Sequence, residues 1–148
     1  MGETDWEIRL FVYESLIANG TAPSLKTIAE RSNISPPDAR AALQRLHDAH
    51  ALVLKAGGDE ILMAHPLSAV PTDYRVTVGD MALYANCAWD SLGIPAMLDC
   101  DAHIEARHPL TGDVMRYMVE DKTLQNASGR FVHFAHPFRQ WYDDIVDT

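Results

Sequence analysis

Apolar positions in the first third of the chain recur at helical spacing and predict three amphipathic helices. The first covers residues 5–18, where apolar side chains return every three or four positions until Asn19-Gly20 ends the pattern. Ser24 caps a short second helix, which ends at Asn33. The run Ser35-Pro36-Pro37-Asp38 starts a third, because it places a capping hydroxyl, prolines and an acidic residue in the order that favours a helix N-terminus.

Two apolar runs around a glycine-rich turn follow the third helix. Leu52-Val53-Leu54 and Ile61-Leu62-Met63 flank Gly57-Gly58-Asp59, a pattern that predicts a β-hairpin. Three helices followed by a hairpin is the order of a winged helix-turn-helix. We therefore expect residues 1–64 to form a winged-helix-like lobe.

The rest of the sequence predicts a second lobe that is mainly β. Residues 65–73 contain two prolines, which cannot lie within a helix, and are expected to form an extended linker. The second lobe is then residues 74–148. Its first predicted strand is marked by the alternation of Tyr74, Val76 and Val78.

One helix and three further strands complete the predicted second lobe. Gly79-Asp80 is expected to lead into a helix that carries Cys87 and Asp90 and that Gly93 and Pro95 end. Short strands are expected over residues 102–106, 114–119 and 131–135. The predicted fold class is α+β: a helical, winged-helix-like lobe followed by a small, mainly antiparallel β lobe that carries one active-site helix.

Composition is that of a cytoplasmic globular protein. The 148 residues are 47% hydrophobic and 22% charged, and no apolar run approaches the roughly 20 residues that a membrane span requires. The N-terminus lacks the basic and then apolar order of a secretory signal, and two cysteines are too few for a disulfide framework. The formal charge of −9 opposes binding to nucleic acid or to an anionic membrane.

Cys87 and Asp90 are the strongest candidates for chemistry. Residues three apart are neighbours on a helix surface, so a thiol and a carboxyl at these positions can reach one small ligand. A thiolate is a soft ligand for heavy metals, and a carboxyl can carry a proton. Plainer interpretations stay open, because a single cysteine often packs as a small apolar residue and Asp90 can be a solvated helix residue.

The run Cys-Ala-Trp-Asp-Ser-Leu-Gly-Ile-Pro-Ala from Cys87 to Ala96 resembles the active-site helix of organomercurial (alkylmercury) lyases. His108-Pro109-Leu110-Thr111-Gly112 is similar to a turn between two strands of that family, and Phe131-Val132-His133-Phe134 to its Val-His-Phe strand. The resemblance implies that Cys87 captures the mercury of R–Hg⁺ and that Asp90 relays the proton that releases R–H. No cofactor is implied, and mercury(II) or another thiophilic metal is substrate or product.

The resemblance also implies a substrate pocket around the thiol and the carboxyl. Tyr84, on the turn before Cys87, and Trp89 are expected to help exclude water, and Arg130 and His133 to line the pocket. Arg130 beside Asp90 would keep that carboxylate ionised, which suits an anionic ligand.

The chain departs from the family at the second cysteine. In the family this residue lies just before the Val-His-Phe strand, whereas the stretch here is Ser128-Gly129-Arg130, with Gly129 or Arg130 at the expected position. Family members also continue beyond the point that matches Thr148. We expect a divergent and shortened member of the family. Cys100 and an external small thiol stay open as ways to complete the coordination of the metal, although Asp99-Cys100-Asp101 is typical of an exposed loop.

Three functions stay open. The first is a lyase-like protein that acts on a small organometallic or organic substrate. The second is a non-enzymatic thiol-based metal sensor or transcriptional regulator, whose winged-helix lobe contacts DNA through Arg40, Gln44 and Arg45. The third is an interaction protein that has kept the fold without the chemistry. Residues 1–80 hold seven Lys and Arg against eleven Asp and Glu, which makes nucleic acid a disfavoured partner.

Overall fold

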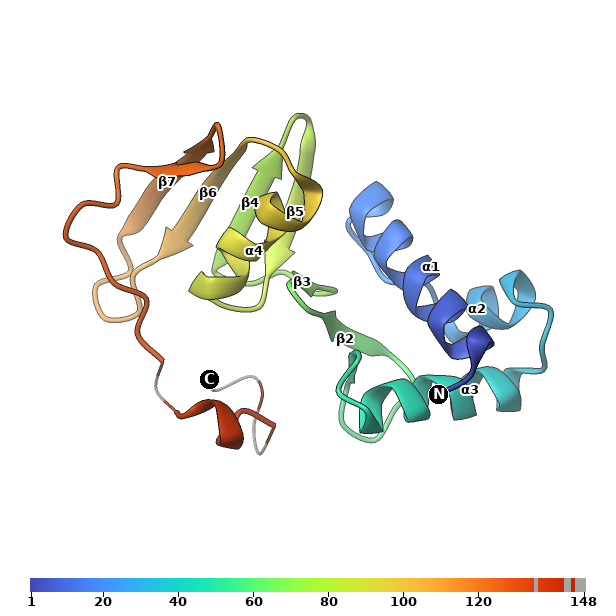
Figure 1. The fold of residues 1–148 in the computed structure, drawn as a ribbon. Helices are drawn as coiled ribbons and strands as arrows, with labels where there is room; N and C mark the ends of the chain where they lie inside the picture. The colour runs from blue at the N-terminus through green and yellow to red at the C-terminus, as the bar shows by residue number, and fades with distance from the viewer. Residues whose placement is uncertain (135, 143–144, 146–148) are drawn as a thin grey trace.

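The three helices predicted for the first third of the chain are present. The computed structural model describes residues 1–134, 136–142 and 145. Its first helices are α1 (Glu3–Asn19), α2 (Leu25–Arg31) and α3 (Pro36–Asp48). The predicted caps are confirmed, because the hydroxyls of Ser24 and Ser35 accept hydrogen bonds from the backbone N–H groups of Thr27 and Asp38. The helices lie together at one end of the molecule (Figure 1).

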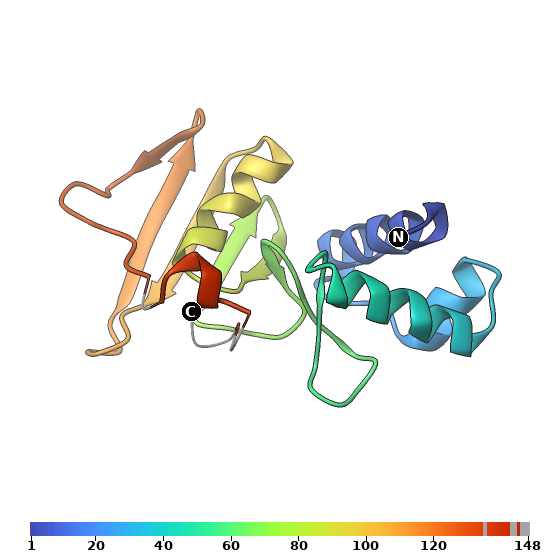
Figure 2. The same ribbon diagram turned by 60° about the horizontal axis from the view of Figure 1, so that its bottom comes forward.

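Eight strands of the described residues form one antiparallel sheet, so the fold class is α+β. The strands are β1 (Val53–Leu54), β2 (Ile61–Ala64), β3 (Leu67–Ser68), β4 (Tyr74–Val78), β5 (Met81–Ala85), β6 (Ala102–Arg107), β7 (Val114–Glu120) and β8 (Thr123–Gln125). Their order in the sheet is β1-β2-β3-β5-β4-β6-β7-β8. Figure 2 shows the long strands at the end of the molecule opposite the three helices.

Strand β3 joins the two halves of the molecule. It lies within residues 65–73, where an extended linker was expected, and pairs with β2 on one side and β5 on the other. One cluster of buried side chains runs through both halves and includes Ile8 of α1, Leu46 of α3, Leu67 of β3 and Ile104 of β6. The helices and the sheet therefore share a continuous core.

The prediction that Gly79-Asp80 leads into a helix is wrong. These residues form a two-residue turn between paired Val78 and Met81, and Gly79 has a positive φ of 55°. Glycine takes such a φ without steric cost, and two-residue turns of this kind favour hairpins. The following residues form β5, so Tyr84 lies on a strand and not on a helical turn before Cys87.

Helix α4 (Ala88–Leu98) packs against β4, β5 and β6. The prediction that Gly93 and Pro95 end it is wrong, since the helix continues to Leu98. Ile94 and Pro95 are buried, and this packing outweighs the hydrogen bond that a proline inside a helix removes. A Cβ at Gly93 would lie 3.1 Å from the Cβ of Pro66, so glycine lets the helix approach the preceding segment closely.

The prediction of a strand over residues 131–135 is also wrong for the four residues that the structure describes. Residues 131–134 form no strand, and residue 135 lies outside the described residues. Strand β6 already lies between β4 and β7, and β7 between β6 and β8, so neither has a free edge for this segment. A short 3-10 helix, η1 (Phe138–Gln140), follows. None of the described helices is long and apolar enough to cross a membrane.

Candidate functional site

The start of α4 brings Cys87 and Asp90 to one small cavity. Cys87 is the N-cap residue, with an extended backbone, and Asp90 lies in the first turn, where a negative charge is favoured by the helix dipole. The cavity has a volume of about 30 Å³ and is lined by His65, Asn86, Cys87, Trp89, Asp90, Phe134, Trp141 and Ile145. Such a volume holds a water molecule or one heavy atom, so an organic group on that atom would extend beyond the cavity.

Burial raises the pKa of the Cys87 thiol above its ordinary value. The carboxylate of Asp90 raises this pKa further, whereas the backbone N–H groups of Asp90 and Trp89 act in the opposite direction by stabilising the thiolate. Because a soft metal binds the thiolate, capture of a metal by Cys87 must displace the thiol proton. Asp90 is the neighbouring group that can accept it.

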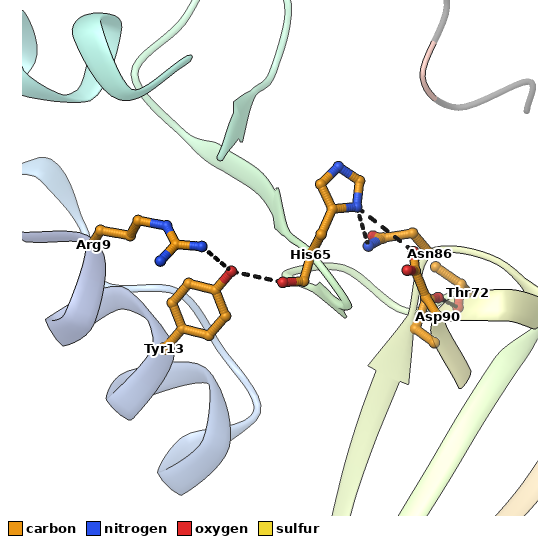
Figure 3. A network of polar contacts seen from close by, with 7 residues as sticks. Arg9, Tyr13, His65, Thr72, Asn86 and Asp90 are labelled. Carbon is orange, nitrogen blue, oxygen red and sulfur yellow. Dashed lines mark hydrogen bonds and ion pairs between the residues drawn. The ribbon is translucent and has the colours of Figure 1, made fainter. Parts of the chain in front are cut away.

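His65 and Asn86 form a polar wall of the same cavity (Figure 3). His65 Nδ1 lies 3.7 Å from Asp90 Oδ2 and 3.5 Å from Asn86 Nδ2. The opposite ring nitrogen, His65 Nε2, and the carbonyl oxygen of Asn86 are buried and have no hydrogen-bond partner among the described residues. Buried polar atoms in proteins normally have a hydrogen-bond partner. These two atoms are therefore exceptions, and both are available to a molecule in the cavity.

A chain of hydrogen bonds connects this wall with helix α1 (Figure 3). The hydroxyl of Tyr13 donates to the backbone carbonyl of His65 at 2.6 Å, and Arg9 donates to the hydroxyl of Tyr13 at 3.0 Å. On the other side, Thr72 donates to the carbonyl of Ala85 at 2.6 Å, which fixes the end of β5 just before Asn86. Both halves of the molecule therefore position the site.

Aromatic side chains from the C-terminal segment line one side of the cavity. Phe134 packs edge-on against Trp89, with ring centroids 6.1 Å apart, and tilts against Trp141 at 5.1 Å. Further along, Tyr142 stacks on His50 at 3.6 Å, so this part of the chain also contacts the end of the helical half. Burial of the phenol raises the pKa of Tyr142, and the charge of Asp90 adds to this shift. The aromatic rings thus form an apolar border of the cavity, opposite in character to its polar wall.

The structure does not bring the other predicted pocket residues to this cavity. Arg130 and His133 line a separate cavity of about 410 Å³ on the other side of the first turn of α4, and Tyr84 lines neither. The Arg130 guanidinium contacts the sulfur of Met115 at 4.0 Å, and Arg130 and Asp90 line different cavities. Of the predicted pocket residues, Trp89 alone joins Cys87 and Asp90.

Cys100 is too far from Cys87 to share a metal with it. The two cysteines lie at opposite ends of α4, whose 11 residues extend about 16 Å. Both are free thiols. Of the two ways to complete the coordination of the metal, the one through Cys100 is therefore disfavoured by the geometry, since Cys100 does not line the cavity at Cys87. Among the described residues, no three His, Cys, Asp or Glu side chains are grouped to hold a metal ion.

The residues suggested for DNA contact each bind a carboxylate of the chain. Arg40 pairs with Asp59 at 2.6 Å, Arg45 with Asp5 at 2.7 Å, and Gln44 donates to Asp48 at 2.7 Å. The buried carboxylate of Asp5 has a lowered pKa, chiefly because Arg45 hydrogen-bonds to it. These positive charges are thus compensated within the protein.

Sequence reasoning missed His65 and Asn86 as site residues. His65 lies next to a proline in a segment expected to be a linker, and nothing in its local pattern indicates that the chain folds back onto α4. Asn86 could have been predicted from one feature of the sequence: it is a polar residue directly before the candidate thiol of Cys87, so its side chain lies close to the same site.

Comparisons with known proteins found a matching family model and a matching solved structure. The sequence model of a family described as alkylmercury lyase matches residues 67–148, which include the whole of α4. A solved structure, described as the mercury-bound form of MerB2, aligns with a TM-score of 0.66 and 22% identity, which shows a shared fold. The alignment covers 84% of this chain and 59% of that one, so the chain spans about three fifths of that protein. No curated protein matches the chain in sequence.

Proposed function

This chain belongs to the alkylmercury lyase family, and from that premise we propose that it breaks the carbon–mercury bond of a small organomercurial compound. Cys87 binds the mercury and Asp90 delivers the proton to the carbon. One observation carries the proposal: the thiol of Cys87 and the carboxyl of Asp90, three residues apart at the start of α4, line the same cavity.

The proposed steps conserve protons and charge. As the sulfur of Cys87 bonds to R–Hg⁺, the thiol proton passes to the Asp90 carboxylate. The resulting carboxylic acid then protonates the carbon, so that R–H leaves, the carbon–mercury bond breaks, and mercury(II) stays on the sulfur. The aromatic side chains over the cavity keep water from competing for the proton.

The second sulfur is proposed to come from an external small thiol. Neither Cys100 nor the stretch around Arg130 places a thiol at the cavity, and mercury(II) favours soft sulfur ligands. A small thiol from solution completes the coordination and carries mercury away. A reducing compartment such as the cytoplasm, where such thiols are plentiful, is part of this proposal.

The test is release of benzene from a phenylmercury compound with a small thiol in excess, followed by gas chromatography. Wild-type protein should release benzene in repeated turnovers, and Cys87→Ser should reduce release to the rate of thiol alone. Cys100→Ser is the matched control, because it removes the other thiol of the chain far from the cavity. Equal release from wild type and Cys87→Ser would overturn the proposal.

A metal sensor is the second proposal, because the hydrogen bonds from His65 through Tyr13 to Arg9 link the cavity to α1. In it, helices α1–α3 and the β1–β2 hairpin act as a winged helix-turn-helix that binds DNA. The ion pairs of Arg40 and Arg45 within the chain do not favour it. Mercury(II)-dependent, salt-sensitive retardation of DNA fragments, without benzene release, would replace the lyase proposal with this one.

A further inference from the structure

The second cavity beside α4 has the size of a small-molecule site and an uneven distribution of charge. Its volume of about 410 Å³ lies within the range of cavities that hold drug-sized ligands. It is bounded by the first turns of α4, the face of β4, β6 and β7, and the chain after β8, which returns toward the start of α4 (Figure 2). The chemistry proposed at Cys87 and Asp90 does not use this cavity, because neither residue lines it.

The wall of this cavity is mainly apolar and partly aromatic. Its flat side chains are Tyr74 and Tyr117 from the sheet, and Leu92 and Ile104 add aliphatic surface between them. Phe131 of the returning segment lies at the rim and is 92% exposed, so its ring is available to a ligand. Aromatic rings bind other rings by edge-to-face or offset stacking in addition to burying area. The cavity therefore suits a flat organic group better than an extended polar one.

The side chains of the cavity that can carry a charge at neutral pH are all basic. Arg107, His108, Arg130 and His133 line it, and no Asp or Glu does so among the described residues. This is unusual for a chain whose formal charge is −9. Such a local excess of positive groups beside an apolar wall favours an organic anion.

Arg130 is the group available to bind that anion. Arg107 is already engaged, because it lies 3.5 Å from the carboxylate of Asp73 and donates to the carbonyl of Gly112. Arg130, in contrast, has only the sulfur of Met115 at 4.0 Å, and no carboxylate of the described residues pairs with it. A guanidinium presents two parallel N–H groups that match a carboxylate.

We propose that this cavity binds an aromatic carboxylate, with its ring between Tyr74, Tyr117 and Phe131 and its carboxylate on Arg130. Binding needs neither mercury nor Cys87, so it stands or fails independently of the lyase activity. The size of the cavity fits a fused bicyclic ring better than a single one.

The test is a calorimetric titration of the full chain with 2-naphthoate, compared with the uncharged 2-naphthamide. We expect binding of one naphthoate per chain and weaker binding of the amide. Arg130→Gln should weaken naphthoate binding about tenfold or more, as expected for loss of a charge-assisted hydrogen bond, and Arg130→Lys should restore part of it. Arg116→Gln is the matched control, since it removes an exposed charge of β7 that does not line the cavity.

Amide chemical shifts in NMR spectra show where on the protein the naphthoate binds. Naphthoate should shift the resonances of Leu92, Ile104 and Tyr117 and leave those of α3 unchanged. Three results would overturn the proposal: equal affinity for naphthoate and naphthamide, equal effects of Arg130→Gln and Arg116→Gln, or no binding at all. Benzene release that persists in Arg130→Gln would leave the lyase proposal intact in each case.

Discussion

Two cavities border the first turn of α4, and they differ in every property that bears on function. The first, at Cys87 and Asp90, has about 30 Å³, contains buried polar atoms that find no partner among the described residues, and is lined by Phe134 and Trp141. The second has about 410 Å³, a mainly apolar wall and Arg130, with which no carboxylate in the described part of the chain pairs. Metal capture with proton transfer fits the small cavity, whereas recognition of an organic group fits the large one.

The difference also shows how one helix turn can serve both cavities. Cys87, Trp89 and Asp90 face the small cavity, and Ala88, Ser91 and Leu92 face the large one, as the helical period requires. A substitution on one side should therefore leave the other cavity unchanged.

Replacing the thiol should give the largest effect. Cys87→Ser should lower benzene release from a phenylmercury compound by about 1,000-fold or more, because a hydroxyl does not bind mercury as a soft thiolate does. Cys100→Ser should stay within about twofold of wild type, and both variants should bind 2-naphthoate normally. Loss of naphthoate binding in Cys87→Ser would contradict the separation of the two cavities.

Replacing the carboxyl should block proton transfer and leave capture of the metal intact. Asp90→Asn should lower benzene release by about 100-fold or more, the usual range for loss of a general acid. Phenylmercury should still react with Cys87, as measured by titration of the remaining thiol. If Asp90→Asn released benzene at the wild-type rate, the carboxyl would have no part in the reaction.

The pH dependence of Cys87 should change in the same variant. Burial and the charge of Asp90 raise the pKa of the thiol, so its reaction with iodoacetamide should reach half its maximum at a higher pH than in the unfolded chain. Asp90→Asn removes the negative charge, so the midpoint should fall and the rate at neutral pH should rise severalfold. The Cys100→Ser background isolates the signal, and an unchanged midpoint would show that the two groups do not interact.

Stability should respond to pH with a matching sign. A thiol whose pKa is raised in the folded state holds its proton longer there than in the unfolded state. Its contribution is fully present below the unfolded pKa and is lost as pH rises through the folded pKa. Urea unfolding of Cys100→Ser should therefore show a loss of stability at alkaline pH that becomes smaller when Cys87→Ser is added to the same background. An equal loss in both proteins would contradict a raised pKa at Cys87.

The link to α1 should give the smallest effect. Tyr13→Phe removes the hydroxyl that donates to the His65 carbonyl at 2.6 Å, which should cost about 1 kcal/mol of unfolding free energy and lower benzene release a few fold. Urea denaturation and the benzene assay measure the two effects. Naphthoate binding should not change, because α1 does not line the large cavity. Unaltered stability and release would show that the helical half does not position the small cavity.

Sequence patterns predicted the secondary structure correctly where local and tertiary preferences agree. The capping residues Ser24 and Ser35 marked helix starts that the structure confirms. The same kind of pattern predicted the wrong element where tertiary packing decides the structure. The run Met81-Ala82-Leu83-Tyr84-Ala85 is composed largely of good helix formers but pairs as a strand, and Pro95 lies inside a helix because its buried side chain packs on the sheet.

The residues of the site divide in the same way, into those that local spacing predicts and those that depend on tertiary structure. The spacing in the sequence was enough to predict that Cys87 and Asp90 lie together, because residues three apart are neighbours in any helical turn. Arg130 and His65 depend on how the chain folds back over long sequence separations, and no local pattern reports that. Arg130 consequently lies at the other cavity, whereas His65 lies 3.7 Å from Asp90 without having been singled out.

Intact-mass spectrometry of the protein after one addition of phenylmercury tests the central claim most directly, because it follows capture and proton transfer on the same molecule. Wild type should first gain phenylmercury at Cys87 and then lose the phenyl group while keeping mercury, whereas Asp90→Asn should hold phenylmercury unchanged. The account would be contradicted if wild type kept the phenyl group as long as Asp90→Asn, or if the adduct lay on Cys100.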